Sequence, residues 1–238
     1  MLNVDNLKKR FGAFEAVKGI SFSVAKGEVL GFLGPNGAGK STTMRMITGF
    51  LPPTSGTASI CGHDIVSDPV GAKKCLGYLP ESAPGYRAMA VGEYLAFIAA
   101  IRGFRGAAAK ERVEVAIEKA RLQPVVKKTI DTLSKGYRQR TCFAQAILHD
   151  PAVLIMDEPT DGLDPNQKYT VREMIREMAA EKAIVISTHI LEEVDAVCTR
   201  AIVIADGEIK ADGTPEKLRA MDPSGRLDAV FRNLTMKA

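Results

Sequence analysis

The chain contains no tryptophan, and aromatic residues of all kinds make up only 6% of its 238 residues. Its few cysteines lie far apart and form no C-x-x-C pair, so the sequence favours reduced thiols in a cytosolic protein and argues against a zinc site. They are Cys61, Cys75, Cys142 and Cys198. No stretch approaches the roughly 18 consecutive apolar residues that a membrane span needs, and the first residues, MLNVDNLKKRF, lack the apolar core of a signal peptide. The sequence therefore predicts a chain that neither spans a membrane nor is secreted, and that needs a partner for any role at a membrane.

The chain also lacks a large excess of charge of either sign. The formal net charge is +4, and lysine and arginine alternate with acidic residues instead of gathering in one run. This distribution predicts no nucleic-acid partner. Hydrophobic residues make up 46% of the chain and charged residues 25%, which is ordinary for a soluble globular α/β protein.

Short apolar runs alternate with helical patterns along most of the chain, and this alternation favours a largely parallel sheet with helices on both faces. Strands are predicted at residues 2–7, 16–24, 28–33, 57–61, 75–79, 152–156, 183–187 and 201–205. Asp164 and Pro165 predict a helix start, as the N-cap and the first helical residue. Asp206 and Gly207 predict the turn of a hairpin.

A helical stretch from about residue 82 to 135 resembles a lobe inserted into this core. Within it, apolar side chains repeat at helical spacing on one face: Tyr94, Phe97, Ile98 and Ile101. Such a stripe favours the core of the lobe. A short helical tail is predicted from about residue 214 to 238, and no linker interrupts the chain, so residues 1–238 are predicted to form one domain.

One sequence motif predicts a specific ligand. Residues 34–41 read GPNGAGKS, a full match to G-x-x-x-x-G-K-[ST], the loop that cradles the phosphates of a nucleoside triphosphate with Mg²⁺. A predicted strand precedes it and a helix follows, which disfavours a chance glycine-rich turn. Backbone N–H groups at such a helix start attract anions. The predicted nucleotide contacts are Gly34, Pro35, Asn36, Gly37, Ala38, Gly39, Lys40, Ser41 and Thr42.

Two adjacent carboxylates, Asp157 and Glu158, follow the apolar strand at residues 152–156. In a protein with a phosphate loop, such a strand lies beside the loop and its Asp helps to hold Mg²⁺ together with the loop hydroxyl, here that of Ser41. Glu158 can then orient or deprotonate the attacking water. Without the phosphate loop, a helix cap or surface acids would be the better interpretation.

The run LSKGYRQR at residues 133–140 resembles the L-S-G-G-Q signature of the ATP-binding cassette (ABC) ATPases. Further matches follow that family's order over nearly the entire chain. Phe11 resembles the aromatic that stacks on adenine, residues 162–164 resemble the dimer-contact loop, and His189 resembles the switch histidine that contacts the γ-phosphate. The resemblance implies an α/β fold: a P-loop NTPase core with a mainly parallel sheet, an N-terminal antiparallel β subdomain and an inserted α-helical lobe.

The chain departs from the family pattern at three motif positions besides the adenine contact. Lys135 and Tyr137 replace a Gly and the Gln of the signature, whereas Ser134 and Gly136, which family members use on the γ-phosphate, are kept. Glu81 stands where the family usually has a Gln that touches Mg²⁺ and water, which adds a negative charge while keeping a possible metal ligand.

The family resemblance implies that two cassettes close head to tail around two ATP molecules. Each site would take Lys40 from one chain, and Ser134 and Gly136 from the other, because ATP needs hydrogen-bond donors on more sides than one loop covers. The implied partners are a second ABC ATPase chain, as an ATP-dependent dimer, and a transmembrane permease. In the family, the region of the stripe at residues 94–101 borders the groove that receives a cytoplasmic helix of the permease, which is the alternative to a core role for these side chains. The implied location is cytoplasmic, peripheral on the inner face of the cell membrane.

Within the family, the chain looks most like ATPases of exporters that pair with a separate six-helix permease, the group that includes drug, polysaccharide and gliding-motility export. A soluble ABC ATPase, such as one for iron–sulfur cluster assembly, remains the alternative. A P-loop kinase or GTPase is disfavoured, because the signature would be unexplained and no N-K-x-D motif occurs. The sequence does not name a cargo.

Overall fold

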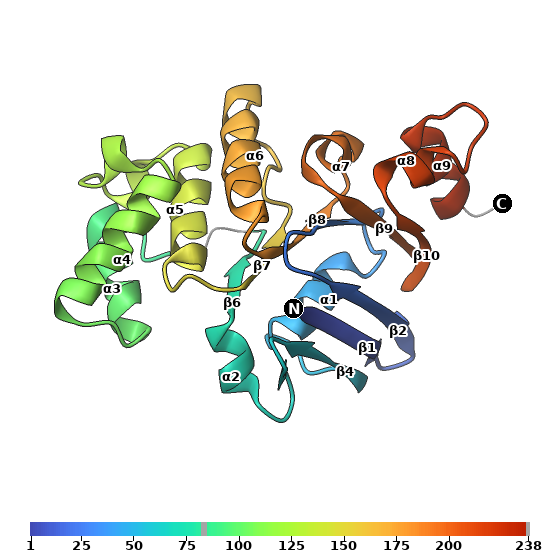
Figure 1. Cartoon of the computed structure of the whole chain (residues 1–238), viewed down its shortest axis with the longest axis horizontal. Coiled ribbons are helices and arrows are strands. Elements are labelled where there is room, and N and C mark those ends of the chain that lie inside the picture. The colour runs from blue at the N-terminus through green and yellow to red at the C-terminus, as the bar shows by residue number, and fades with distance from the viewer. Residues whose placement is uncertain (82–84, 237–238) are drawn as a thin grey trace.

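The computed structural model describes residues 1–81 and 85–236, and its largest element is a twisted six-stranded sheet (Figure 1). The strand order is β10-β9-β3-β8-β7-β6, and every neighbouring pair is parallel except β9 with β10. This confirms the predicted mainly parallel sheet. The strands are β3 (Val29–Leu33), β6 (Leu76–Leu79), β7 (Val153–Asp157), β8 (Ala183–Thr188), β9 (Arg200–Ala205) and β10 (Glu208–Gly213).

Helices cover the faces of this sheet, which explains why β3, β7 and β8 are buried along their whole length. The covering helices include α1 (Lys40–Ile47), α6 (Pro165–Ala179) and α7 (Leu191–Val197). Helix α6 begins as the sequence predicts, since the Asp164 side chain accepts a hydrogen bond from the Gln167 N–H at 3.0 Å.

A second, antiparallel sheet lies beside the N-terminal half of the core, as predicted. Its order is β2-β1-β4-β5, with β1 (Leu2–Phe11), β2 (Phe14–Val24), β4 (Ser55–Ile60) and β5 (His63–Asp64). The first two strands are longer than predicted, because they pair as far as the hairpin turn, where Phe11 lies opposite Phe14. That extension brings Phe11 to the tip of a rigid hairpin.

The helical lobe lies at the β6 end of the six-stranded sheet and contains α3 (Val91–Ile101), α4 (Gly106–Lys119) and α5 (Lys135–Ile147) (Figure 1). The first residues of the predicted lobe, 82–84, lie outside the described residues. The prediction that the stripe on α3 forms the lobe core is wrong for two positions: Tyr94 is buried, but Phe97 and Ile101 are 38% and 65% exposed. Helices α4 and α5 cover the Tyr94 side of α3 and leave the other side open.

Sequence patterns missed a short helix, α2 (Pro69–Lys74), although its Asp-Pro start carries the same capping signal as α6. The predicted hairpin is confirmed, with Asp206 and Gly207 at positive φ in the β9–β10 turn. The helical tail contains α8 (Pro215–Arg219) and α9 (Leu227–Thr235), and its last two residues, 237 and 238, lie outside the described part. Among the described helices, none is both long and apolar enough to cross a membrane.

Candidate active site

The phosphate loop connects β3 to α1, and the backbone around it requires glycine at two positions of the loop. Gly39, the N-cap of α1, has φ of +105°, and a Cβ atom there would lie 2.7 Å from the Ala16 carbonyl oxygen. A Cβ on Gly34 would lie 2.4 Å from the Ile204 carbonyl oxygen. Side chains at these positions would push the loop away from β2 and β9. The loop is therefore held close against two sheets.

A cavity of about 560 Å³ opens over this loop. Its walls bring together most of the predicted site residues, from five separate parts of the chain. These are Phe11, Pro35, Asn36, Gly37, Gly39, Lys40, Ser41, Thr42, Glu81, Glu158 and His189. Gly34 and Ala38 lie in the same loop, and Asp157 is buried behind Ser41.

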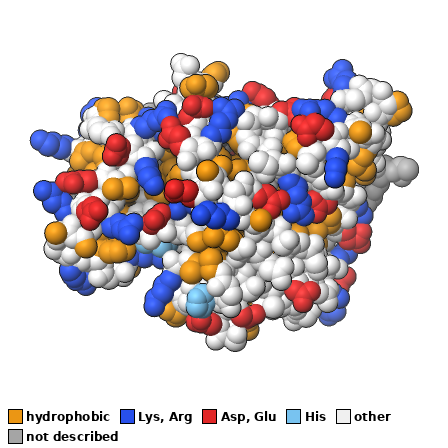
Figure 2. All heavy atoms as spheres, viewed as in Figure 1, with side chains coloured by type: hydrophobic (Ala, Val, Ile, Leu, Met, Phe, Trp, Pro, Cys, Tyr) orange, Lys and Arg blue, Asp and Glu red, His pale blue; other side chains and the backbone are white. Residues whose placement is uncertain are grey.

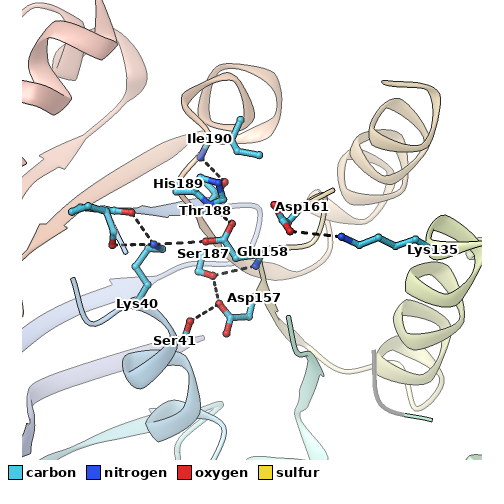
Figure 3. Close-up of polar contacts among 12 residues, drawn as sticks. Lys40, Ser41, Lys135, Asp157, Glu158, Asp161, Ser187, Thr188, His189 and Ile190 are labelled. Carbon is cyan, nitrogen blue, oxygen red and sulfur yellow. Dashed lines mark hydrogen bonds and ion pairs between the residues drawn. The ribbon is translucent and has the colours of Figure 1, made fainter. Parts of the chain in front are cut away.

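Lys40 is the central cation of the cavity, and only 5% of its side chain is exposed. Its Nζ donates hydrogen bonds to the carbonyl oxygens of Gly34 at 2.7 Å and Pro35 at 3.3 Å, and lies 3.7 Å from Glu158 Oε1 (Figure 3). Burial lowers the pKa of Lys40, against the opposing effect of Glu158 and Asp157. An incoming phosphate can replace the two carbonyl acceptors and supply the negative charge that this buried ammonium favours.

Asp157 is 1% exposed, and its two carboxylate oxygens have different surroundings. Oδ1 accepts hydrogen bonds from the hydroxyls of Ser41, at 3.2 Å, and Ser187 (Figure 3). Oδ2 is buried without a partner. A hydroxyl and a free carboxylate oxygen beside a phosphate-binding loop suit Mg²⁺, which prefers oxygen ligands and usually takes one or two protein groups together with substrate phosphates. Among the described residues, no group of three or more His, Cys, Asp or Glu side chains is arranged to hold a metal ion, so phosphate and water would complete such a site.

Glu158 projects from the end of β7 into the cavity at a strained backbone position, with φ of +51°. Its N–H donates to the Ser187 carbonyl oxygen at 3.1 Å, which ties this turn to β8. Its Oε2 lies 2.7 Å from His189 Nδ1, and its Oε1 faces Lys40. Burial raises the pKa of Glu158, with His189 and Lys40 opposing that shift. A carboxylate that favours a proton more than usual, held by a histidine at the cavity wall, is suited to accept a proton from water.

Two of the predicted nucleotide contacts lie outside the cavity over the phosphate loop of their own chain. Ser134 is the exposed N-cap of α5 and accepts a hydrogen bond from the Tyr137 N–H at 3.4 Å. Gly136 is buried, and a Cβ there would lie 2.5 Å from Gln167 Oε1. Neither residue lines the cavity over the phosphate loop. The described residues of one chain thus surround the cavity incompletely.

Sequence reasoning missed four residues that belong to this region. Phe14, Ala16 and Asp161 line the cavity, and the Ser187 hydroxyl contacts Asp157. Gly12 is a turn signal, from which Phe14 could have been predicted to lie next to Phe11 at a hairpin tip. No local pattern marks Ser187, because its role follows from the parallel pairing of β7 with β8, in which it lies opposite Asp157.

Comparison with known proteins assigns this architecture to a family. Residues 17–161 match the family model described as "ABC transporter". The chain is 36% identical to the uncharacterized ABC transporter ATP-binding protein YxlF of Bacillus subtilis (strain 168), over 92% of this chain and 72% of that one. It is 39% identical to the linearmycin resistance ATP-binding protein LnrL of the same organism, over 92% of this chain and 70% of that one.

Two further proteins show the same likeness. The Nod factor export ATP-binding protein I of Ralstonia nicotianae (strain ATCC BAA-1114 / GMI1000) is 37% identical over 92% of this chain and 68% of its own length. A solved ATP-binding subunit of an ABC transporter superimposes with a TM-score of 0.88 at 30% identity, covering 99% of this chain and all of that one. The chain therefore belongs to the ABC transporter family, as one of its ATP-binding ATPase subunits.

Proposed function

We propose that this chain binds and hydrolyses ATP to drive a separate membrane permease, and that it serves an exporter. The observation that carries the proposal is the incomplete site: Lys40 and Glu158 meet in one cavity, while Ser134 lies on the exposed start of α5, outside it. A second chain that presents its own Ser134 and Gly136 would complete the donor set around the triphosphate.

In the proposed site, the Ser41 hydroxyl and the unpaired Oδ2 of Asp157 would hold Mg²⁺, and Glu81 at the cavity wall would be a further candidate carboxylate. The ion would supply charge compensation for the phosphates. Lys40 would exchange its bonds to backbone carbonyls for bonds to phosphate oxygens. Phe11, which is 49% exposed at the hairpin tip, would stack its ring on the base.

Hydrolysis in this proposal depends mainly on positioning and charge. Glu158 would orient the attacking water and accept its proton, because its carboxylate faces the cavity and burial favours the protonated form. His189 would hold Glu158 through Oε2 and face the γ-phosphate. Closure by a second chain would exclude other water and strengthen each of these contacts.

ATP would act as the ligand that joins the two chains, because the closed pair binds it more tightly than either open chain does. Such a ligand shifts the population toward closure by its differential affinity, and hydrolysis removes that preference. We propose a dimer of this kind, in which opening and closing are transmitted to the permease.

The proposed permease contact is a second cavity of about 540 Å³ between the helical lobe and the rest of the chain. Its lining includes Phe50, Tyr78, Ile98 and Ile101, and Ile101 and Phe50 are 65% and 75% exposed. An apolar groove of this size suits a cytoplasmic helix of a membrane protein. The exposure of the α3 stripe, which the core interpretation did not predict, is the feature that supports this contact.

The relatives support the exporter class by their names, which include Nod factor export and linearmycin resistance. None of the comparisons favours the alternative of an iron–sulfur assembly ATPase. Figure 2 shows lysine and arginine interspersed with acidic residues over the face in view. We propose a cytoplasmic location, peripheral on the inner face of the membrane that holds the permease.

Complementation between two inactive variants tests the shared site. Lys40→Ala removes the phosphate cation, and Ser134→Arg blocks the surface that the partner's nucleotide would contact. Each variant alone should lack ATPase activity, and mixed dimers should regain about one working site of two. Recovery of activity on mixing supports sharing, whereas no recovery in dimers shown to be mixed contradicts it.

A further inference from the structure

The loop that follows Glu158 brings an extra carboxylate to the nucleotide cavity. Asp161 lines that cavity together with Glu81 and Glu158, and Asp157 is buried behind it. Lys40 is the buried cation that opposes them. A triphosphate brings several more negative charges into the same space, so each uncompensated carboxylate at the rim weakens its binding.

Lys135 supplies a cation to this extra carboxylate from another element. It is the first residue of α5, and its Nζ lies 3.7 Å from Asp161 Oδ2 (Figure 3). The ion pair bridges from the helical lobe to the loop after β7. The lysine of this pair is one of the departures from the family signature, in which a glycine usually stands at the position of Lys135.

The surrounding backbone leaves room for this side chain. Gly162, next to Asp161, has φ of +62°, and a Cβ atom there would lie 2.2 Å from Lys135 Nζ. Glycine suits this left-handed backbone conformation and leaves open the space that the ammonium occupies here. The loop itself is tightly folded, because the Asp161 N–H donates to the Glu158 carbonyl oxygen at 3.2 Å. A displacement of Asp161 would therefore also disturb the backbone of Glu158.

We propose that Lys135 is a positioning residue for the nucleotide bound on its own chain: it neutralises Asp161 at the cavity rim and holds the loop after Glu158 away from the triphosphate. This inference rests on the proposed nucleotide binding and adds to it. The role is distinct from that of the neighbouring Ser134, which is proposed to serve the nucleotide of the partner chain. It predicts an effect on isolated chains, before any dimer forms.

The test is equilibrium binding of Mg-ADP and of a magnesium complex of a non-hydrolysable ATP analogue, at protein concentrations where the parent is monomeric. Lys135→Met should weaken binding of the ATP analogue by up to about fivefold, because the charge of an ion pair whose side chains are 54% and 51% exposed is lost next to an anion. Binding of Mg-ADP, which carries less charge, should weaken by a smaller factor. Lys135→Arg should bind as the parent does.

The double variant Lys135→Met/Asp161→Asn separates charge compensation from other roles of Lys135. It should bind within about twofold of the parent, since the carboxylate that needed compensation is gone. Lys110→Met is the matched control, because Lys110 is also a lysine paired with an acid, Glu114, at 3.8 Å on an exposed helix face. It should leave binding unchanged.

Three results would overturn the inference. In the first, Lys135→Met binds both nucleotides as tightly as the parent. In the second, the double variant is as weak as Lys135→Met. In the third, the loss is equal for the two nucleotides. A parent protein that binds no nucleotide would instead contradict the proposed function, so the two failures are distinguishable.

Discussion

Replacing Asp157 by asparagine tests whether this buried carboxylate serves a metal ion or the fold. One oxygen accepts two hydroxyl hydrogen bonds, and the other, Oδ2, is buried without a partner. A buried polar atom without a partner costs about 1–3 kcal/mol. Asparagine keeps the acceptor at Oδ1 and removes the charge, although its amide nitrogen also lacks an acceptor. We therefore expect the free energy of unfolding without nucleotide to rise by about 1 kcal/mol, or about 2–4 °C in Tm.

The same substitution should remove most of the stabilisation by Mg-ATP. A ligand at one hundred times its dissociation constant stabilises the folded parent by about 2.7 kcal/mol. The variant lacks the carboxylate proposed to hold Mg²⁺, so its gain should fall below about 1 kcal/mol under the same conditions. The order of stability is therefore expected to reverse: the variant unfolds at a higher temperature than the parent without ligand and at a lower temperature with it.

Thermal unfolding followed by circular dichroism, with no nucleotide, with Mg-ATP and with ATP plus a chelator, measures both effects. Asp195→Asn is the control, because Asp195 is an exposed acid that contacts Arg219 and does not line the cavity. It should change the free energy of unfolding by no more than about 0.5 kcal/mol and keep the Mg-ATP response. A lower Tm of Asp157→Asn without nucleotide would show that the carboxylate stabilises the fold. A parent-like response to Mg-ATP would exclude Asp157 from the metal site.

Three further changes test other parts of the site. Burial raises the pKa of Glu158 above its ordinary value of 4.5, so the parent is stabilised by this group below pH 4.5 and loses that stabilisation as the pH rises through the folded pKa. Over that pH range, Glu158→Gln should therefore gain stability relative to the parent in thermal unfolding. A stability difference that does not change with pH would refute the raised pKa. Phe11→Ala should raise KM for ATP about tenfold in steady-state assays, with Phe11→Tyr near the parent; equal KM values for all three proteins would exclude base stacking. Gly39→Ala should lower the free energy of unfolding, measured in urea, by about 2–4 kcal/mol, because of the positive φ and the nearby Ala16 carbonyl. Gly27 also has a positive φ but open space around it, so Gly27→Ala should cost about 1 kcal/mol. Equal costs would contradict the packing argument.

Local signals in the sequence predicted the parts of the fold that depend on short-range physics. The phosphate loop follows a buried strand and opens a helix, and the pair Asp157 and Glu158 ends another buried strand, as the apolar runs indicate. The Asp164 cap and the Asp206 turn were equally readable, because a capping side chain or a turn type is set by one or two residues.

The rest depends on contacts between distant segments, which no local pattern contains. The apolar stripe on α3 has the same helical spacing whether or not other helices cover it. Phe97 and Ile101 are exposed because α4 and α5 pack against the other side of α3. Ser187 reaches Asp157 through strand pairing, and Lys135 reaches Asp161 from another lobe. The family resemblance already implied that Ser134 serves the site of a second chain, and the structure is consistent with this in placing Ser134 outside the cavity of its own chain.

The central claim is that one chain contains only part of each ATPase site and that ATP joins two chains. Sedimentation velocity of Glu158→Gln tests it most directly, because this variant should bind Mg-ATP without hydrolysing it. We expect the monomer to convert to a dimer when Mg-ATP is added and to remain monomeric with Mg-ADP. A variant that stays monomeric while nucleotide is shown to be bound would contradict the claim.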